Sequence, residues 1–364
     1  MVTTSVAVDL GSRSYDIHVG SGLLPRVDAL VRPPTGARRV ALVTQEPVAS
    51  LYAAEVDHAL DRLGLEVVRL DVPAGEAAKS LATVADMYDE LARHGFGRSD
   101  MVLALGGGVV GDVAGFVAAT WNRGIALVQV PTTLVAQVDA AIGGKTAINL
   151  AHGKNLVGSF HQPRAVVSDV ATLASLPARE LTSGLGEVIK YGLLGAPDLL
   201  DLLETRLDDV RRAEPRVLEE LVARCSSIKA ATVSADEREA GARAHLNLGH
   251  TYGHALEVAT GYETFLHGEA VAVGLRVALL VGEAMGLTPG DLVRRVEALL
   301  ARAGLPTAAP RVERDTLWTA MGLDKKAGSE GVRFVLIGQD GHPTLAVPPR
   351  TVVDGAIDIV EEAA

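Results

Sequence analysis

The stretch MVLALGGGVVGD, residues 101–112, decides the fold class of this 364-residue chain. Its first five residues form a short apolar run, typical of a strand buried on both faces, and the glycines mark a tight turn into a helix. Backbone without Cβ atoms can approach a phosphate closely, and a helix N-terminus offers free N–H groups. The string matches G-x-G-x-x-G, which favours dinucleotide binding, although a purely structural turn has the same pattern.

Strands and helices alternate along the first half of the chain. Strands are expected at 40–44, 65–72, 101–105, 126–130 and 165–170, and helices at 48–63, 81–94 and 113–120. This alternation predicts a parallel sheet with helices on both faces. The glycine-rich turn follows several strands, and Val130–Thr132 occupies the place where the usual fingerprint has an acidic residue. We therefore expect a variant of the Rossmann form.

The second half of the chain is mostly helical. From about Leu173 the β-branched runs give way to stretches of helical period, at 179–194, 215–234, 250–260, 267–285 and 292–303. A late exception is a predicted hairpin of 332–337 with 344–347. The segment between these two strands contains the turn-forming pair Asp340-Gly341.

Length and composition fit two globular domains, predicted at 1–173 and 174–364. Hydrophobic residues make up 48% of the chain, enough for sizeable cores, and the net charge is −11. Such a charge repels polyanions, so we expect neither nucleic acid nor a membrane as partner. The apolar segment 270–281 is interrupted by Arg276 and is too short to span a bilayer. The single cysteine, Cys225, cannot form an internal disulfide, so we expect a cytoplasmic protein.

Three of the chain's ten histidines, His250, His254 and His267, lie close together in the sequence. Imidazoles with a carboxylate suit zinc or a similar divalent ion, although a lone histidine is more often structural. The four-residue spacing would place His250 and His254 on one helix face and nominate them as a ligand pair. Spacing alone cannot say which two of the three bind.

Basic and amide side chains gather beside glycines. GGKT at 143–146 and GKN at 153–155 place such groups in predicted loops, where the alternative is a set of solvated lysines. AGEAAK at 74–79 and PTT at 131–133 follow strands and could hold phosphate or ribose. A local basic site in an acidic protein favours a small polyanion that carries both phosphate and carboxylate.

Together these motifs resemble the 3-dehydroquinate synthase family of sugar-phosphate cyclases, from about Gly36 to Ile337. The matching segments are Gly75–Lys79, Gly106–Asp112, Gln129–Leu134, Gln137–Asp139, Gly143–Thr146, Gly153–Asn155, Gly186–Lys190, Asp236–Glu239, Leu246–His254, His267–Glu269 and Asp324–Lys326. The resemblance implies an N-terminal Rossmann-like NAD-binding α/β domain and a mostly α-helical C-terminal metal-binding domain. It also implies conversion of 3-deoxy-D-arabino-heptulosonate 7-phosphate to 3-dehydroquinate and phosphate, with NAD regenerated at each turnover.

The resemblance implies a divalent metal, zinc or cobalt, on Glu187, His250 and His267. His254 would then contact the substrate, which replaces the ligand pair that spacing favours. One carboxylate and two imidazoles leave a position for substrate hydroxyls, whose ionisation a metal would favour.

Further roles follow from the same resemblance. Substrate hydroxyls would be oriented by Asp139, Lys190, Lys229 and His254. The phosphate would be held by Lys145, Asn155, Asn247 and Lys325 or Lys326, with Arg123 reaching across a homodimer interface. The carboxylate of the substrate would be held by Arg243. The residues expected to bind NAD are Gln45, Gly75, Glu76, Lys79, Gly107, Gly108, Val109, Asp112, Thr132, Thr133, Lys145, Lys154, Thr172 and Ser175.

The chain departs from the family pattern at a few positions. Gln45 stands where Asp or Asn is usual, Ser175 replaces Thr, Gly186 replaces Ala beside Glu187, and His245 is an unusual neighbour of the Asn247 motif.

Three alternatives remain: a cyclase for another sugar phosphate, a metal-dependent polyol dehydrogenase, and a silent NAD- or zinc-binding module. The dehydroquinate synthase interpretation is favoured over another cyclase by the presence of Arg243, Asn247, His254 and the 324–326 motif. A substrate without a carboxylate would not need these groups to pair with it.

Overall fold

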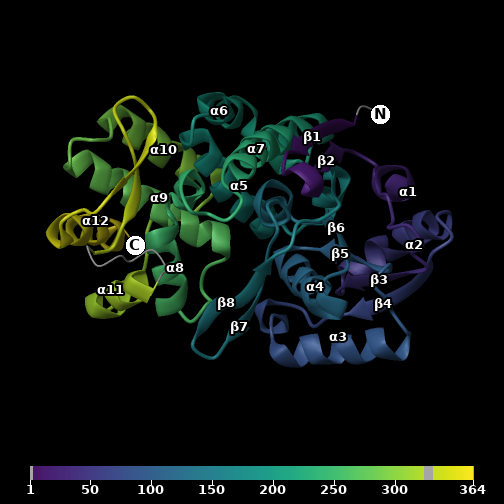
Figure 1. Cartoon of the computed structure of the whole chain (residues 1–364). Coiled ribbons are helices and arrows are strands. Elements are labelled where there is room, and N and C mark those ends of the chain that lie inside the picture. The colour runs from purple at the N-terminus through teal and green to yellow at the C-terminus, as the bar shows by residue number, and fades with distance from the viewer. Residues whose placement is uncertain (1–2, 324–330, 364) are drawn as a thin grey trace. The chain divides into compact units, whose positions relative to one another are not determined.

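The computed structural model describes residues 3–323 and 331–363, and the chain divides into two compact units (Figure 1). Unit 1 comprises Met1–Leu176 and Ala213–Arg238, and unit 2 comprises Pro177–Arg212 and Glu239–Ala364. This division differs from the predicted domains 1–173 and 174–364, because Ala213–Arg238 packs with unit 1. That segment contains α7 (Pro215–Ala235), which contacts the first strands of the chain. Helical period alone does not reveal which core a helix joins.

Unit 1 contains a seven-stranded sheet. In spatial order its strands are β1 (Thr4–Val8), β2 (Tyr15–Gly20), β9 (Ala165–Asp169), β6 (Ala126–Pro131), β5 (Met101–Gly106), β3 (Arg39–Thr44) and β4 (Glu66–Asp71). Only β1 and β2 pair antiparallel; every other pair in the sheet is parallel. From β3 the chain passes to the edge strand β4 and returns to β5 on the other side of β3. The carboxyl ends of β3 and β5 therefore form the switch point at which parallel sheets bind ligands.

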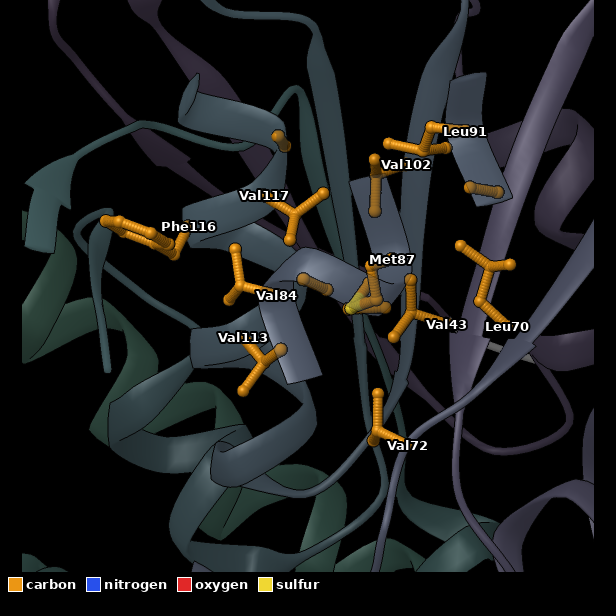
Figure 2. Close-up of a cluster of buried hydrophobic side chains, with 14 of the residues drawn as sticks. Val43, Leu70, Val72, Val84, Met87, Leu91, Val102, Val113, Phe116 and Val117 are labelled. Atoms are coloured by element: carbon orange, nitrogen blue, oxygen red, sulfur yellow. The ribbon is translucent and has the colours of Figure 1, made fainter. Parts of the chain in front are cut away.

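Helices cover both faces of this sheet, as the alternating sequence predicts. The core on one face joins the sheet to α3 (Leu81–Arg93) and α4 (Gly108–Thr120), and Figure 2 shows Val43, Leu70 and Val102 of the strands near Met87 of α3. The other face packs against α1 (Val27–Leu30), η3 (Ala49–Ala53) and α2 (Ala54–Asp61). All six residues of β5 are buried, which explains its unbroken apolar run.

The five strands and three helices predicted for this half are confirmed within a few residues, and α4 starts earlier than expected, at the glycines themselves. The antiparallel hairpin of β7 (Lys145–Leu150) and β8 (Gly153–Phe160) lies where the sequence indicates loops. Short helical turns complete unit 1: η1 (Gly11–Arg13), η2 (Leu24–Arg26), η4 (Glu76–Ala78), η5 (Trp121–Arg123), η6 (Ala136–Ala140) and η7 (Val170–Ser175).

Unit 2 is built around α9 (His267–Ala284), in which most residues are buried. It packs against α5 (Ala178–Leu193), α8 (His250–Ala259), α10 (Gly290–Ala303) and α12 (Arg350–Glu362). The unit also contains α6 (Pro197–Arg211), η8 (Ala242–Asn247) and α11 (Arg314–Leu323). The predicted late hairpin is confirmed as β10 (Phe334–Ile337) and β11 (Pro343–Ala346). Within the described ranges, each helix is either too short or too polar to cross a lipid bilayer.

Asp100 lies immediately before β5, at the amino ends of the strands, which is the end of the sheet opposite the switch point. Its carboxylate accepts hydrogen bonds from the backbone N–H groups of Arg38 at 3.0 Å, Arg39 at 2.9 Å and Gly97 at 2.7 Å. Burial alone would raise the pKa of Asp100, but these N–H groups outweigh burial and lower it. The ionised carboxylate therefore stabilises the folded state.

We expect Asp100→Asn to lower the free energy of unfolding at pH 7 by about 1–3 kcal/mol, because an amide cannot replace a charged acceptor of several N–H groups. A depressed folded pKa contributes stability above the unfolded value of 3.8, and this contribution is lost as the pH falls through the folded value. Urea unfolding at pH 7 and pH 3 should show the difference from the parent shrinking in acid. An equal difference at both pH values would contradict this account.

Candidate functional site

Three helices of unit 2 bring a carboxylate and two imidazoles together. Glu187 lies in α5, while His250 and His267 are the first residues of α8 and α9. The Oε1 atom of Glu187 lies 3.5 Å from Nε2 of His250 and 3.3 Å from Nε2 of His267. Glu187 and His250 are buried, and the three potential ligand atoms lie within 4.8 Å of one another. The three residues named by the resemblance therefore meet at one point.

Glycines allow these helices to approach at backbone distance. A Cβ atom on Gly186 would lie 2.3 Å from the carbonyl oxygen of Gly268, so α5 and α9 touch beside Glu187 and His267. A Cβ atom on Gly274 would lie 1.9 Å from the carbonyl oxygen of Gly249, so α8 and α9 touch as well. The absence of side chains at these contacts sets the spacing of the cluster.

The outer nitrogen of each imidazole has its own acceptor. Nδ1 of His250 lies 3.1 Å from the carbonyl oxygen of Leu248, and Nδ1 of His267 lies 3.3 Å from Oε2 of Glu257. Both Nε2 atoms are thereby left facing Glu187. Metal-binding histidines usually have such outer partners, and one carboxylate with two imidazoles is a donor set suited to zinc or cobalt. The residues present therefore fit a divalent metal.

The two imidazoles differ in their proton affinity. Burial, helped by the nearby Lys190 ammonium, holds the pKa of His250 well below its ordinary value, which keeps this ring neutral. Burial would also lower the pKa of His267, but the carboxylates of Glu187 and Glu257 outweigh it and raise this pKa to about 10. In the metal-free protein His267 is therefore a cation at neutral pH, and a metal ion must displace its proton.

Lys190 and His254 border the same cluster. Lys190 lies one turn after Glu187 in α5, is buried, and its Nζ pairs with Oε2 of Glu187. The His254 ring centroid lies 5.2 Å from that of His250 and 5.9 Å from that of His267. A second group of possible ligands joins His254 and His267 to Glu257. Among the described residues, no such group combines His250 with His254, the pair that spacing favours.

Two further predicted residues of unit 2 lie on η8, just before α8. Arg243 is buried, and Asn247 donates from Nδ2 to Oε1 of Glu239 at 2.8 Å and to the carbonyl oxygen of Ala244 at 2.9 Å. Lys325 and Lys326, also predicted for the phosphate, lie outside the described residues.

In unit 1 the glycine-rich turn stands at the switch point of the sheet. β5 ends at Gly106 and α4 begins at Gly108, so Val109 and Asp112 lie at the start of the helix. A narrow crevice here is lined by Gly106, Gly107, Gly108, Gly111, Gln129, Pro131, Ala136, Ala140 and Ala141.

Close packing around this turn explains its glycines. A Cβ atom on Gly107 would lie only 3.0 Å from the Thr133 side chain. The backbone N–H of Thr132 donates to the carbonyl oxygen of Gly106 at 3.0 Å, which joins the two strand ends. The glycines of this turn therefore allow its close packing.

A charged network flanks the start of α4. Nζ of Lys79 lies 2.7 Å from Oδ2 of Asp112 and 3.6 Å from Oε1 of Glu76, and it also donates to Oδ1 of Asn155. Burial would lower the pKa of Lys79, but the two carboxylates outweigh the effect of burial and raise this pKa. Gly75, with φ of 83°, forms the turn before Glu76, and Nζ of Lys154 lies 3.9 Å from Oε1 of Glu76. Five residues predicted separately, four for NAD and Asn155 for phosphate, therefore form one network.

Sequence reasoning missed Asn149 of β7. Its Nδ2 donates to Oε1 of Glu76 at 2.9 Å, and its Oδ1 accepts from the backbone N–H of Asn155 at 2.9 Å. The residue belongs to no glycine-rich motif, and only the pairing of β7 with β8 brings it to the network.

Other predicted residues of unit 1 lie in smaller groups. Nζ of Lys229 in α7 donates to the carbonyl oxygen of Asp139 at 2.6 Å and lies 2.9 Å from its Oδ1. In η7, the Thr172 hydroxyl accepts from Nε2 of Gln137 at 3.2 Å, and the Ser175 hydroxyl lies 2.6 Å from the Tyr52 hydroxyl.

Gln45, Lys145 and Arg123 lie outside these groups. Gln45 directly follows β3, and its buried Oε1 has no hydrogen-bond partner among residues 3–323 and 331–363. Lys145 is the first residue of β7. Arg123, with φ of 69°, is exposed and, in the part of the chain described, makes no ion pair with another predicted residue.

Solved structures with this fold include enzymes that were solved with NAD+ and a divalent metal bound. A 2-deoxy-scyllo-inosose synthase solved with carbaglucose-6-phosphate, NAD+ and Co2+ has a TM-score of 0.88 and 28% identity, covering 98% of this chain and 99% of that one. ValA, a 2-epi-5-epi-valiolone synthase from Streptomyces hygroscopicus subsp. jinggangensis 5008 solved with NAD+ and Zn2+, gives the same values. A probable glycerol dehydrogenase from Sinorhizobium meliloti 1021, at 16% identity and a TM-score of 0.67 over 94% of this chain and 95% of that one, shares the fold alone. The chain therefore has the fold of the sugar-phosphate cyclases, the class to which the first two enzymes belong.

Sequence comparison narrows this class to one family. The 3-dehydroquinate synthases of Halorhodospira halophila and Symbiobacterium thermophilum are 45% and 48% identical to this chain; they cover 97% and 92% of it, and the matches span 99% and 94% of their own lengths. Family models described as 3-dehydroquinate synthase N-terminal and C-terminal match residues 69–183 and 184–327. The chain belongs to the 3-dehydroquinate synthase family.

Proposed function

We propose that this protein converts 3-deoxy-D-arabino-heptulosonate 7-phosphate to 3-dehydroquinate and inorganic phosphate. The reaction would be a carbon–oxygen lyase step of the shikimate pathway, which leads to chorismate and the aromatic amino acids. The observation that carries the proposal is the cluster that His267 forms with the buried residues Glu187, Lys190 and His250, in which a donor set suited to a metal adjoins an ammonium group. A neutral polyol would not need cationic groups of this kind, whereas an anionic sugar acid does.

Glu187, His250 and His267 would hold a divalent ion, zinc or cobalt. When bound, the ion would supply Lewis-acid chemistry that favours ionisation of a substrate hydroxyl. Lys190, held against Glu187, can donate a hydrogen bond to an oxygen of the substrate, and so can His254, whose ring lies beside that of His250. These two side chains would therefore orient the substrate and move its protons.

The glycine-rich turn and the network of Glu76, Lys79, Asp112 and Lys154 would hold NAD, together with Gly75 and Thr132, Thr133, Thr172 and Ser175. When bound, NAD would supply a transient oxidation of the substrate carbinol and would be regenerated by the returning hydride. The orphaned Oε1 of Gln45 supports this placement, because it can accept a hydrogen bond from a ribose hydroxyl at the end of β3.

The remaining predicted residues would bind the charged ends and hydroxyls of the substrate. The phosphate would be held by Lys145, Asn155, Asn247 and Lys325 or Lys326, and by Arg123 of a second copy in a homodimer. The buried Arg243 would pair with the carboxylate, and Asp139 with Lys229 would orient hydroxyls. The departing phosphate can act as its own base, which agrees with the lack of a dedicated base in the predicted set. A cytoplasmic location fits the lone Cys225, which is buried.

The test is incubation of the purified protein with the heptulosonate phosphate, a catalytic amount of NAD+ and zinc. We expect one phosphate released for each substrate consumed, no accumulation of NADH, and loss of the reaction when a chelator is added. Accumulating NADH would instead indicate a polyol dehydrogenase. Phosphate release only from a sugar phosphate without a carboxylate would indicate another cyclase, so both outcomes contradict the proposal.

A further inference from the structure

Glu257 is the one carboxylate in contact with the outer edge of the proposed metal site among the described residues. Its Oε2 lies 3.3 Å from Nδ1 of His267, while Nε2 of the same ring lies 3.3 Å from Oε1 of Glu187. The imidazole therefore lies between two carboxylates, one on each nitrogen. Neither the sequence motifs nor the roles proposed above use Glu257.

The fold holds Glu257 firmly in this position. It lies in α8, seven residues after His250 and three after His254, so all three side chains project from the same side of the helix. The Glu257 side chain is only 7% exposed. Burying a carboxylate is costly unless it is paired, so its position against His267 is a specific interaction and not the default of a surface glutamate.

The two imidazoles of the cluster are held in different ways. His250 has the backbone carbonyl of Leu248 as its outer acceptor, which no side-chain substitution can remove. His267 begins α9 after a turn and depends on a side chain for the same purpose. The geometry of His267 is therefore open to control by one residue.

We propose that Glu257 is a positioning residue for the metal site: its carboxylate accepts the Nδ1–H of His267 and, once the Nε2 proton is displaced, keeps the Nε2 lone pair available for an ion shared with Glu187. The proposal rests on the metal ligands named under the proposed function. A carboxylate in this place also makes the ring a stronger donor than a carbonyl would. Glu257 acts through His267 and does not itself hold the ion.

The competing arrangement is a metal held by His254, Glu257 and His267, whose ligand atoms also lie within 4.8 Å of one another. In that arrangement Glu257 would be a ligand, and Glu187 would not. The two arrangements predict different rankings of variants. A positioning role makes Glu187 indispensable and His254 dispensable for metal affinity, whereas the competing site reverses both.

The experiment measures zinc affinity of the whole chain by competition with a chromophoric chelator, without substrate or NAD. We expect Glu257→Ala to bind zinc about 10–100-fold more weakly than the parent. Glu257→Gln, which keeps the size and an acceptor oxygen, should fall between the two. Glu297→Gln is the matched control, because Glu297 pairs with Arg276 of α9 at 2.7 Å, away from His267. It should bind zinc like the parent.

Two further variants separate the possible failures. If Glu257→Ala binds zinc like the parent while Glu187→Ala loses zinc, the proposed metal site is correct and the proposed role of Glu257 is wrong. Parent-like affinity in Glu187→Ala, with loss in Glu257→Ala and His254→Ala, would establish the competing site and overturn both proposals. Cobalt absorption spectra add a readout of ligand geometry: the Glu257→Ala bands should shift, and the Glu297→Gln bands should match the parent.

Discussion

His267→Ala should bind zinc on the order of 100-fold or more weakly than the parent and lose turnover, while still folding. The change removes one of three proposed ligands, which should cost more than removal of an outer partner such as Glu257. Zinc content after dialysis, competition titration and phosphate release would measure the effect. His342→Ala is the control, because His342 lies exposed on the β10–β11 turn of the same unit. Full zinc content in His267→Ala would remove this residue from the ligand set.

The same variant has a pH signature in the metal-free protein. Burial opposes the charge on His267, but Glu187 and Glu257 raise its pKa from 6.5 to about 10. A raised folded pKa contributes stability that is present below the unfolded value and lost as the pH rises through the folded value. Metal-free His267→Ala should therefore be less stable than the parent at pH 7, and the difference should shrink toward pH 10. Zinc affinity of the parent should rise over the same range, because the proton on His267 competes with the metal.

The parallel sheet could be predicted from the sequence because its central strands are buried on both faces. Unbroken apolar runs such as 101–105 have no other simple explanation between helical segments. β1 was not predicted, because only two of its five residues are buried and its hydrophobic pattern is therefore weak. The β7–β8 hairpin was not predicted, because most of β8 is exposed and its glycines indicate loops. The residues of a short segment do not indicate which distant part of the chain will pair with it or pack on it.

The sites divide in the same way. Glycine motifs and grouped histidines indicate where chemistry is concentrated, since those residue types are uncommon in that density. The sequence did not reveal Asn149 or Glu257, because each is a single polar residue on a regular element. Their contacts with Glu76 and His267 arise only when strands pair or helices pack. Spacing likewise favours His250 with His254, although helix packing places His267 beside Glu187.

Gly274→Ala should destabilise the protein by about 1–3 kcal/mol, in spite of the better helix propensity of alanine. The new Cβ would lie 1.9 Å from the carbonyl oxygen of Gly249 and 3.0 Å from the backbone nitrogen of Gly253. Both neighbours are backbone, so no side chain can rotate away, and α8 must separate from α9. Urea unfolding of the metal-free protein would measure the loss.

Gly355→Ala is the matched control, with an expected effect of opposite sign. Gly355 lies inside α12, and nothing lies within 4 Å of a Cβ built there, so alanine should raise the free energy of unfolding by about 0.5–1 kcal/mol. The contrast separates the contact from the intrinsic preference of the residue. Because α8 carries His250 and α9 carries His267, forcing these helices apart should also weaken zinc affinity, which Gly355→Ala should leave unchanged. Equal stability of the two variants would mean that α8 and α9 are not in backbone contact, and the glycines would then not set the distance between the ligands.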